Sequence, residues 1–300
     1  MTAEVLSALR VRPGIRCADG TLGGGGHAAA ILNASRPDGW LFGCDRDGAA
    51  IEAATARLAE FAGRWEVRRG NFADLAELSG RTDFDAVLLD LGVSSHQLDT
   101  AERGFSFQQD GPLDMRQDAR QEHTAADLVN ELPADELADI FWALGEEPQA
   151  RRFAKAIELD RRTQPFRTTA QLAGLIERLA PRHGRKAHPA TRVFQALRMA
   201  TNDELGALER GLAAALAVLR PGGRLAVLTF HSLEDRKVKE FGRARARDYT
   251  FPGLVDVPEL RVPRAPELCW VERKAKPPGE AEVTANPRAR SAQLRIMEKL

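Results

Sequence analysis

Four consecutive glycines stand at residues 23–26, within the sequence DGTLGGGGH at residues 19–27. They follow a strand-like segment at residues 14–19 and precede a helix-like run, HAAAILNA. A turn without side chains lets the backbone approach a ligand closely, and the next helix then directs its free N–H groups at that ligand. This segment therefore predicts a ligand-binding loop between a strand and a helix.

A carboxylate follows in the position that a nucleoside ligand requires. The short apolar run WLFGCD at residues 40–45 ends in Asp45, nineteen residues after Gly26. An acidic residue at the tip of the second strand is placed to bind the two hydroxyls of a ribose. Together, the loop and Asp45 predict an adenosine-containing cofactor on a Rossmann-like sheet. The simpler interpretation, a glycine loop that only makes a tight turn, leaves Asp45 without a role.

The same segment favours one cofactor over another. The run GGGGH does not fit the dinucleotide fingerprint GxGxxG. Asp19 precedes the glycines, where its carboxylate would repel phosphates but would suit a ligand with an amino group and a sulfonium. These features indicate S-adenosylmethionine.

Strand-like and helix-like segments alternate over the first hundred residues. Apolar strand patterns are followed by helical ones, which is typical of a doubly wound parallel sheet with ligands at the carboxyl ends of its strands. The expected strands lie at residues 14–19, 40–45, 65–70 and 84–90, and the expected helices between them at residues 27–34 and 47–61. Further strands are expected at residues 221–230, 269–275 and 291–300.

A helical block interrupts this alternation. Residues 91–120 show no clean period but are not of low complexity, which favours an ordered functional loop. Helical patterns follow at residues 124–132, 134–144, 149–161 and 169–179, and again at 189–199 and 204–219. The predicted fold is α/β, with a Rossmann-like domain over residues 1–108 and 189–300 and an inserted helical substrate-recognition domain over 109–188.

Asp90 ends the fourth expected strand, beside the cofactor cleft of such a sheet. An amine conjugated with a base ring is a poor nucleophile, and a carboxylate that accepts its hydrogen bond directs the lone pair toward the methyl group. Positioning of the two reactants supplies the rest of the rate. We therefore expect Asp90 to be the catalytic residue. The alternative role is capping the next turn or contacting the cofactor only.

Two further segments suggest contacts with nucleic acid. Residues 178–198 contain six Lys or Arg and no acid, and Arg192, Gln195 and Arg198 recur there at helical spacing. A basic face of this kind suits phosphate binding, although an ordinary solvated helix face has the same pattern. His231 ends the fifth expected strand and is placed to contact a base or phosphate. The structural alternative for this segment is a capping and packing role for Ser232 and Glu234 at the start of the next helix.

Composition excludes several classes of protein. There are 43 basic and 43 acidic residues, so any nucleic-acid contact must come from local patches. No apolar run approaches a membrane span of roughly 20 residues, and no secretory signal is recognisable, so we expect a cytoplasmic protein without membrane contact. The three cysteines form no CxxC pair and the histidines form no cluster, so neither a metal site nor a disulfide is expected.

Eight motifs in order make the chain similar to the RsmH (MraW) family of bacterial rRNA methyltransferases. The motifs run from residue 19 to residue 297. They are DGTLGGGGH, GCDRD, DLGVSSHQLD, RGFSF with DGPLDMR, GEE with ARR and AKAI, HPATRVFQALRM with NDEL, LTFHSLEDR and NPRARSAQLR. The resemblance implies S-adenosylmethionine-dependent methylation of N4 of one cytidine in 16S rRNA of the small ribosomal subunit, near the decoding site.

The resemblance also implies roles for individual residues. The cofactor contacts are expected at Gly25, Gly26, His27, Asp45, Phe72, Asp90 and Gln97. Among them Asp45 would hold the ribose, Phe72 would lie against the adenine, and Asp90 and Gln97 would lie near the methionine end. Substrate contacts, which are a separate hypothesis and do not come from the resemblance, are expected at Phe105, Arg116, Arg192, Gln195, Arg198 and His231. Phe105 or Phe107 would stack on a flipped base, and a basic loop at residues 182–186 would bind phosphates.

Other functions stay open at this level. Methylation of DNA is disfavoured because Leu91-Gly92-Val93-Ser94 follows the acid where DNA amino-methyltransferases carry a Pro-Pro-Tyr-like motif, and methylation of a protein amine is a further alternative. A cofactor-binding ribosome assembly factor without turnover is a candidate from another class. A nicotinamide dehydrogenase is the weakest alternative, for want of GxGxxG. The apolar faces of the helical insert would pack internally or form a homodimer.

Overall fold

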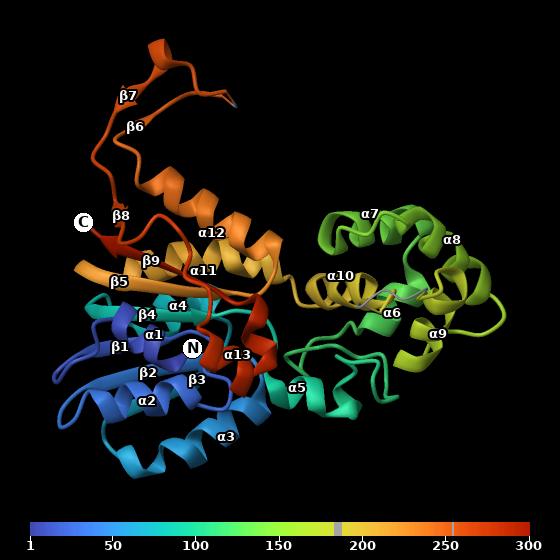
Figure 1. Ribbon diagram of the computed structural model, residues 1–300, viewed down its shortest axis with the longest axis horizontal. Coiled ribbons are helices and arrows are strands. Elements are labelled where there is room, and N and C mark those ends of the chain that lie inside the picture. Colours follow the sequence, from blue (N-terminus) through green and yellow to red (C-terminus); the bar gives the residue numbers. More distant parts are fainter. Residues whose placement is uncertain (183–187, 254) are drawn as a thin grey trace. The chain divides into compact units, whose positions relative to one another are not determined.

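A mostly parallel sheet forms the centre of the larger part of the molecule (Figure 1). The computed structural model describes residues 1–182, 188–253 and 255–300. Within these residues, seven strands form one sheet in the order β3-β2-β1-β4-β5-β9-β8. The strands are β1 (Arg16–Asp19), β2 (Trp40–Asp45), β3 (Trp65–Arg69), β4 (Phe84–Asp90), β5 (Leu219–Thr229), β8 (Leu268–Trp270) and β9 (Gln293–Lys299).

The first five strands of this sheet are parallel, and the last two pair antiparallel at one edge. The order reverses between β1 and β4, which is the switch point where a Rossmann-like sheet binds its ligand. The predicted α/β, Rossmann-like class is confirmed.

Side chains alternate across the sheet to build two cores. In β4, Ala86 and Leu88 face one core and Val87 and Leu89 face the other. The first core is covered by α1 (Thr2–Ala8), α2 (Gly26–Ala34) and α3 (Gly48–Leu58). The second is covered by α4 (Leu75–Ser79), α11 (Glu204–Val218) and α12 (Ser232–Arg245). The result is three layers, with strands buried on both faces, as their continuous apolar sequences require.

Short elements complete this part of the chain. They are η1 (Ala59–Phe61), η2 (Phe72–Asp74), β6 (Tyr249–Thr250), η4 (Pro258–Leu260), β7 (Val262–Pro263), α13 (Glu280–Ala285) and η5 (Pro287–Ser291). Strands β6 and β7 pair antiparallel in a separate two-stranded ribbon. We call residues 247–264, which contain this ribbon, the arm.

A second unit is helical and has its own core. Its elements are α5 (Ser95–Asp99), η3 (Ala101–Arg103), α6 (Ala125–Glu131), α7 (Ala134–Gly145), α8 (Ala150–Asp160), α9 (Thr169–Leu179) and α10 (Thr191–Thr201). Phe141, Phe153 and Leu197 are among the fully buried side chains between these helices. At Gly145 a Cβ would lie 2.6 Å from the carbonyl oxygen of Arg192, so α7 and α10 approach each other closely there.

The boundaries of the two units differ from the predicted spans. The sheet unit comprises Met1–Gly92 and Leu205–Leu300, and the helical unit comprises Val93–Glu204. The helical unit is thus longer at both ends than residues 109–188. The helical unit starts earlier than predicted because Phe105 belongs to the helical core. It ends later than predicted because α10 packs on α7. Among the described residues, no helix is both long enough and apolar enough to cross a membrane.

Candidate active site

Three strands of the sheet unit end in aspartate at the same edge. Asp19 ends β1, Asp45 ends β2 and Asp90 ends β4. In the parallel registers, Asp19 pairs with Gly43 of β2 and with Leu88 of β4. Asp45 and Asp90 therefore each extend two residues beyond the level of Asp19, on either side of it. This edge gathers three carboxylates around the end of the central strand.

The glycine loop connects β1 to α2 along this edge. Gly25 is the residue before α2 and has a φ of 75°, in the left-handed region that favours glycine. A Cβ at Gly25 would lie 3.1 Å from Cα of Ala54, whereas a Cβ at Gly24 would meet no atom within 4 Å. The loop is therefore packed on α3 at Gly25 and open at Gly24. The backbone of Gly26 begins the helix, as predicted for a loop that directs N–H groups at a ligand.

Asp45 fixes the loop to the tip of β2. Its Oδ2 accepts a hydrogen bond from the N–H of Gly23 at 2.8 Å, and its Oδ1 accepts one from the N–H of Asp47 at 2.9 Å. Each carboxylate oxygen has a further lone pair available for a ligand hydroxyl. Burial raises the pKa of Asp45, against the lowering effect of these two hydrogen bonds. The side chain is thus held in one orientation at the place where a ribose is expected.

Asp19 and Thr21 connect β1 to β4. Asp19 is 1% exposed, and its Oδ1 accepts a hydrogen bond from the N–H of Thr21 at 3.1 Å. The hydroxyl of Thr21 accepts a hydrogen bond from the N–H of Asp90 at 2.6 Å. Burial raises the pKa of Asp19 to about 6. A buried carboxylate of this kind would be stabilised by a cationic ligand.

His27 and Asp90 face each other across the site. Nε2 of His27 lies 3.4 Å from Oδ2 of Asp90. Burial lowers the pKa of His27, but the hydrogen bond and charge of Asp90, with the charge of Asp19, outweigh it and raise the pKa overall. Within the part of the chain that the structure describes, Nδ1 of His27 and Oδ1 of Asp90 are both buried and have no hydrogen-bond partner. Two orphaned polar atoms at a strand tip are a feature that a bound polar ligand would resolve.

Phe72 lies just beyond β3, at the start of η2. Its ring packs so closely on α11 that a Cβ at Gly211 would lie 2.2 Å from Cδ2 of Phe72. The side chain of Asn71 accepts a hydrogen bond from the N–H of Ala73 and begins the turn. The half-buried ring is thus held in a fixed orientation at the same edge of the sheet, as its predicted contact with adenine requires.

Gln97 lies in the helical unit and caps α5. Its Oε1 accepts a hydrogen bond from the N–H of Ser94 at 3.0 Å, and its own N–H donates to Oγ of Ser94 at 3.2 Å. The residue is 6% exposed. The structure therefore shows a capping role for Gln97, and its contact with the cofactor stays a prediction.

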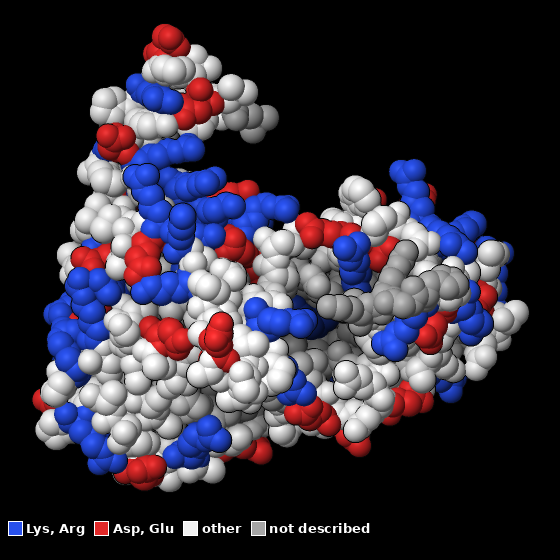
Figure 2. Space-filling model, in the orientation of Figure 1, with Lys and Arg blue, Asp and Glu red and all other residues white. Residues whose placement is uncertain are grey.

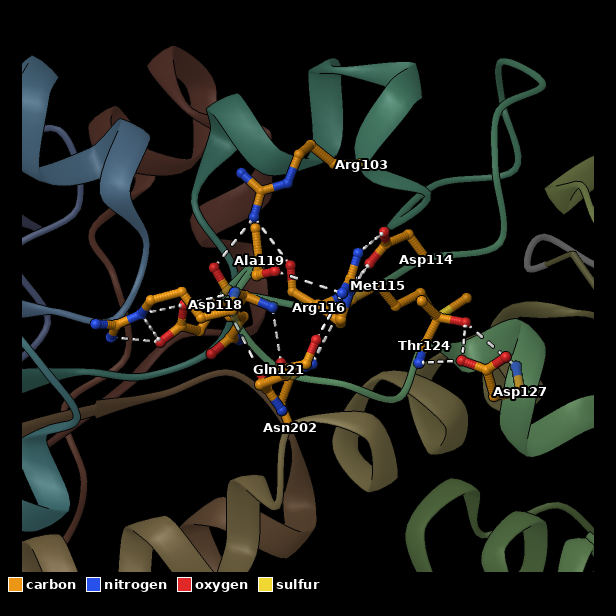
Figure 3. Close-up of polar contacts among 12 residues, drawn as sticks. Arg103, Asp114, Met115, Arg116, Asp118, Ala119, Gln121, Thr124, Asp127 and Asn202 are labelled. Carbon is orange, nitrogen blue, oxygen red and sulfur yellow. Dashed lines mark hydrogen bonds and ion pairs between the residues drawn. The ribbon is translucent and has the colours of Figure 1, made fainter.

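Phe105 and Arg116 have structural roles in the helical unit. Phe105 is 7% exposed and belongs to the helical core, so its ring is not presented for stacking on a base in this conformation. The guanidinium of Arg116 donates to both carboxylate oxygens of Asp114, each at 2.8 Å, and to the carbonyl oxygen of Gln121 at 2.6 Å (Figure 3). Arg116 therefore orders the long loop from within.

The basic helix α10 presents its three predicted residues differently. Arg192 is exposed and donates to the carbonyl oxygen of Glu146 at 2.9 Å. Arg198 is half-buried and forms two hydrogen bonds to Glu204, at 2.8 and 2.7 Å. Gln195 lies between them, with its amide 3.8 Å from Sδ of Met199. Of the two arginines, only Arg192 has no carboxylate partner among the described residues. The predicted loop at residues 182–186 lies, apart from Arg182, outside the described residues.

His231 is itself the N-cap of α12, a role that the sequence predicted for Ser232 and Glu234. Its Nδ1 accepts a hydrogen bond from the N–H of Glu234 at 3.5 Å. Its Nε2 lies 3.0 Å from Oε1 of Glu234 but outside hydrogen-bond geometry. The side chain is thus oriented by the helix that it begins, and its predicted contact with a base or phosphate stays untested.

Two residues that organise these regions, Thr21 and Asn202, were not predicted from the sequence. Thr21 connects the ends of β1 and β4, and the only signal for it was its place in the DGT sequence. Asn202, at the end of α10, anchors residues 115–117 of the long loop, because its side chain donates to the carbonyl of Met115 at 2.7 Å and accepts from the N–H of Gln117 at 2.8 Å. A lone asparagine gives no sequence signal of this kind.

Comparison with known proteins identifies the family. The model of the MraW methylase family matches residues 1–300. A "Ribosomal RNA small subunit methyltransferase H" of Geobacter sulfurreducens is 53% identical to this chain, and the alignment covers 100% of this chain and 97% of that relative. One of the same name from Syntrophotalea carbinolica is 51% identical, with 100% and 96% covered. A solved putative rRNA methylase from Clostridium thermocellum is 13% identical, has a TM-score of 0.45 and covers 99% of this chain and 94% of its own. On the match of the family model and the two close relatives, the chain belongs to the MraW methylase family.

Proposed function

We propose that this chain transfers a methyl group from S-adenosylmethionine to N4 of one cytidine in 16S rRNA of the small ribosomal subunit, near the decoding site. Membership of a methylase family and two relatives named as small-subunit rRNA methyltransferases support the reaction class and the RNA. The observation that supports an amino nitrogen as the methylated atom is the position of Asp90. Its carboxylate lies at the tip of β4, and its Oδ1 has no hydrogen-bond partner among the described residues.

The residues at the edge of the sheet fit this cofactor. Nδ1 of His27 and Oδ1 of Asp90 are buried without partners, and the loop is open at Gly24. Asp45 would hold the ribose hydroxyls, Phe72 would contact the adenine, and the backbone of Gly25 and Gly26 would border the methionine portion. When bound, S-adenosylmethionine supplies a methyl group on a positively charged sulfur. The buried carboxylate of Asp19 would favour that positive charge.

Asp90 would act on the substrate amine. Its Oδ1 would accept a hydrogen bond from the exocyclic N–H₂ of the cytosine, which reduces the conjugation of the nitrogen lone pair with the ring and orients it. His27 would hold the other oxygen, Oδ2, so that the carboxylate cannot rotate away. As the new N–C bond forms at the expense of the methyl–sulfur bond, whose electron pair would stay on sulfur, the nitrogen would become more acidic and give up a proton to Asp90. A cysteine nucleophile is not needed for transfer to an amino nitrogen.

The helical unit would bind the RNA around the target base. Arg192 is exposed and free of a carboxylate, which suits a phosphate contact. Arg198 and Arg116 are engaged by Glu204 and Asp114, so we assign them to holding the unit in shape. Phe105 would have to leave the helical core to stack on a base, and the partly buried Phe107 is therefore the better candidate.

The substrate class is tested by offering the purified protein several substrates with tritiated S-adenosylmethionine. We expect label in small ribosomal subunits from a strain lacking the enzyme, and none in large subunits, duplex DNA or subunits already modified. Label in DNA or in ribosomal protein would contradict the proposal. Binding of the cofactor without transfer to any of them would favour an assembly factor without turnover.

A further inference from the structure

Helix α12 of the sheet unit has a basic surface that the proposed reaction does not use. From Arg236 to Arg247 the chain has six Lys or Arg and one acid, Glu240. The helix packs on the sheet through Leu233 and Val238, which are buried. Lys and Arg side chains gather on the molecular surface over α12 (Figure 2). The helix thus has one apolar side and one strongly basic side.

Some of these cations are neutralised by neighbouring acids. Nζ of Lys237 lies 3.2 Å from Oε2 of Glu209. The guanidinium of Arg245 lies 2.6 Å from Glu267, which also lies 3.5 Å from Arg264. The Lys237–Glu209 pair therefore has little net charge to offer a ligand, whereas Arg245 and Arg264 share the one negative charge of Glu267.

Lys239 and Arg243 differ from these pairs. They lie four residues apart, on one row of the helix. Within the described part of the chain, neither forms a hydrogen bond or an ion pair. Lys239 is half-buried and Arg243 is exposed. Two uncompensated positive charges on one row of a helix repel each other and favour an anion between or above them.

Arg247 extends this row into the arm. Its guanidinium carbon lies 5.8 Å from the ring centroid of Tyr249 and 5.4 Å from that of Phe251. The hydroxyl of Tyr249 donates to Oδ2 of Asp256 at 2.7 Å, so the ring is itself held in place. Stacking on two aromatic rings restricts a guanidinium without neutralising it, which suits recognition of phosphate.

We propose that Lys239, Arg243 and Arg247, which we call the α12 row, bind phosphate groups of the ribosomal RNA in addition to the contacts made at the active site. The choice of RNA as the occupant follows from charge complementarity and rests on the proposed function. The three cations recur every four residues, from the middle of α12 into the arm, so they can contact successive parts of a backbone. Phosphate contacts of this kind position an RNA without reading its sequence.

The test measures how the binding constant for 16S rRNA depends on salt concentration, in the parent chain and in variants of the α12 row. Each phosphate contact contributes a slope of about 0.7 to 0.9 in the logarithm of the binding constant against the logarithm of salt concentration. We expect Lys239→Gln to reduce the slope by about 1, and the triple variant K239Q/R243Q/R247Q by about 2 to 3. The matched control is Lys237→Gln, which removes the same charge from the same helix but one already neutralised by Glu209. Its slope should stay unchanged.

Methyl transfer gives a second readout. In the triple variant we expect KM for small subunits to rise about tenfold or more, with kcat and cofactor affinity unchanged, because binding is lost equally in the ground and transition states. An unchanged slope and an unchanged KM in the triple variant would overturn the assignment. Weaker binding to assembled subunits but normal binding to free 16S rRNA would overturn it too, and would indicate a protein partner. Absence of methyl transfer by the unmodified chain would overturn the proposed function alone, since the slopes are measured by binding.

Discussion

Asp90 is the residue on which the proposed chemistry depends. Its Oδ2 faces His27 and its Oδ1 is unpartnered, so one oxygen is positioned and the other is available. The sequence predicted this residue because it ends an apolar strand. Its pairing with His27 was not predicted, because it depends on how the glycine loop turns into α2.

Replacement of Asp90 should separate chemistry from binding. We expect Asp90→Asn to lower kcat by about 10² to 10⁴-fold, the usual contribution of a positioned acid or base, with cofactor affinity changed far less. Asp83→Asn is the control, since Asp83 precedes β4 at the opposite end and its side chain is 42% exposed. Single-turnover transfer and calorimetric titration of the cofactor measure the two effects. Full activity of the Asp90 variant would exclude the proposed role.

Asp19 is expected to destabilise the fold above its raised pKa. The pKa rises from 3.8 to about 6 because the carboxyl is buried. The folded chain then holds the proton more tightly than the unfolded chain does, so the free energy of unfolding falls as pH rises from about 4 to about 6 and stays low above.

Asp19→Asn should therefore be more stable than the parent chain at pH 8, by up to about 3 kcal/mol, since one pKa unit corresponds to about 1.4 kcal/mol. The difference should shrink toward zero as pH falls to about 4, while cofactor affinity at pH 8 decreases. Denaturant unfolding across this pH range measures the stabilities. A variant that is less stable than the parent at pH 8 would show that the charged form of Asp19 is favoured in the fold.

At the scale of elements, strands and helices with strong patterns were predictable. Strands β2 and β4 and helix α9 occupy the expected residues, because apolar runs and helical periodicity reflect burial within each element. The loop at residues 91–120 was expected to be ordered, but its structure could not be derived. It depends on Arg116, which binds Asp114 and two carbonyls, and on Asn202 from beyond α10.

The glycine loop can be tested as an element. We expect Gly25→Ala to cost about 1–3 kcal/mol and to abolish cofactor binding, because its φ is 75° and a Cβ would lie 3.1 Å from Cα of Ala54. Gly63→Ala is the control for backbone strain alone, since Gly63 has a φ of 79° and open space around a Cβ. Thermal unfolding and cofactor titration measure both. Equal behaviour of the two variants would show that the contact with Ala54 is unimportant.

The two-pronged contact of Arg116 with Asp114 can be tested separately from the positive charge of Arg116. Arg116→Lys keeps the positive charge but cannot form the two-pronged contact with Asp114. We expect the helical unit to lose about 1–3 kcal/mol of stability, in proportion to the charged hydrogen bonds removed. Hydrogen exchange over residues 103–127 reports this loss locally. If the lysine variant is as stable as the parent and only an uncharged variant fails on RNA, Arg116 contacts RNA as the sequence first suggested.

At the scale of the whole molecule, the residues with proposed roles are distributed over two structural units. The sheet unit holds the residues proposed for cofactor and chemistry except Gln97, and the helical unit holds Gln97 and the basic helix α10. The presence of an insert was predictable, since helical patterns replace strand patterns after residue 120. Its boundaries were not, because Phe105 and α10 join the helical core through contacts distant in sequence.

Identification of the methylated atom tests the proposed role of Asp90 most directly. Small subunits from a strain lacking the enzyme are incubated with the protein and S-adenosylmethionine, and the 16S rRNA is digested and analysed by mass spectrometry. N4-methylcytidine at a single position near the decoding site, absent when Asp90→Asn replaces the parent chain, is the predicted result. 5-Methylcytidine, a methylated ribose or a methylated purine as the product would contradict the central claim that Asp90 directs an exocyclic cytosine amine to the methyl group.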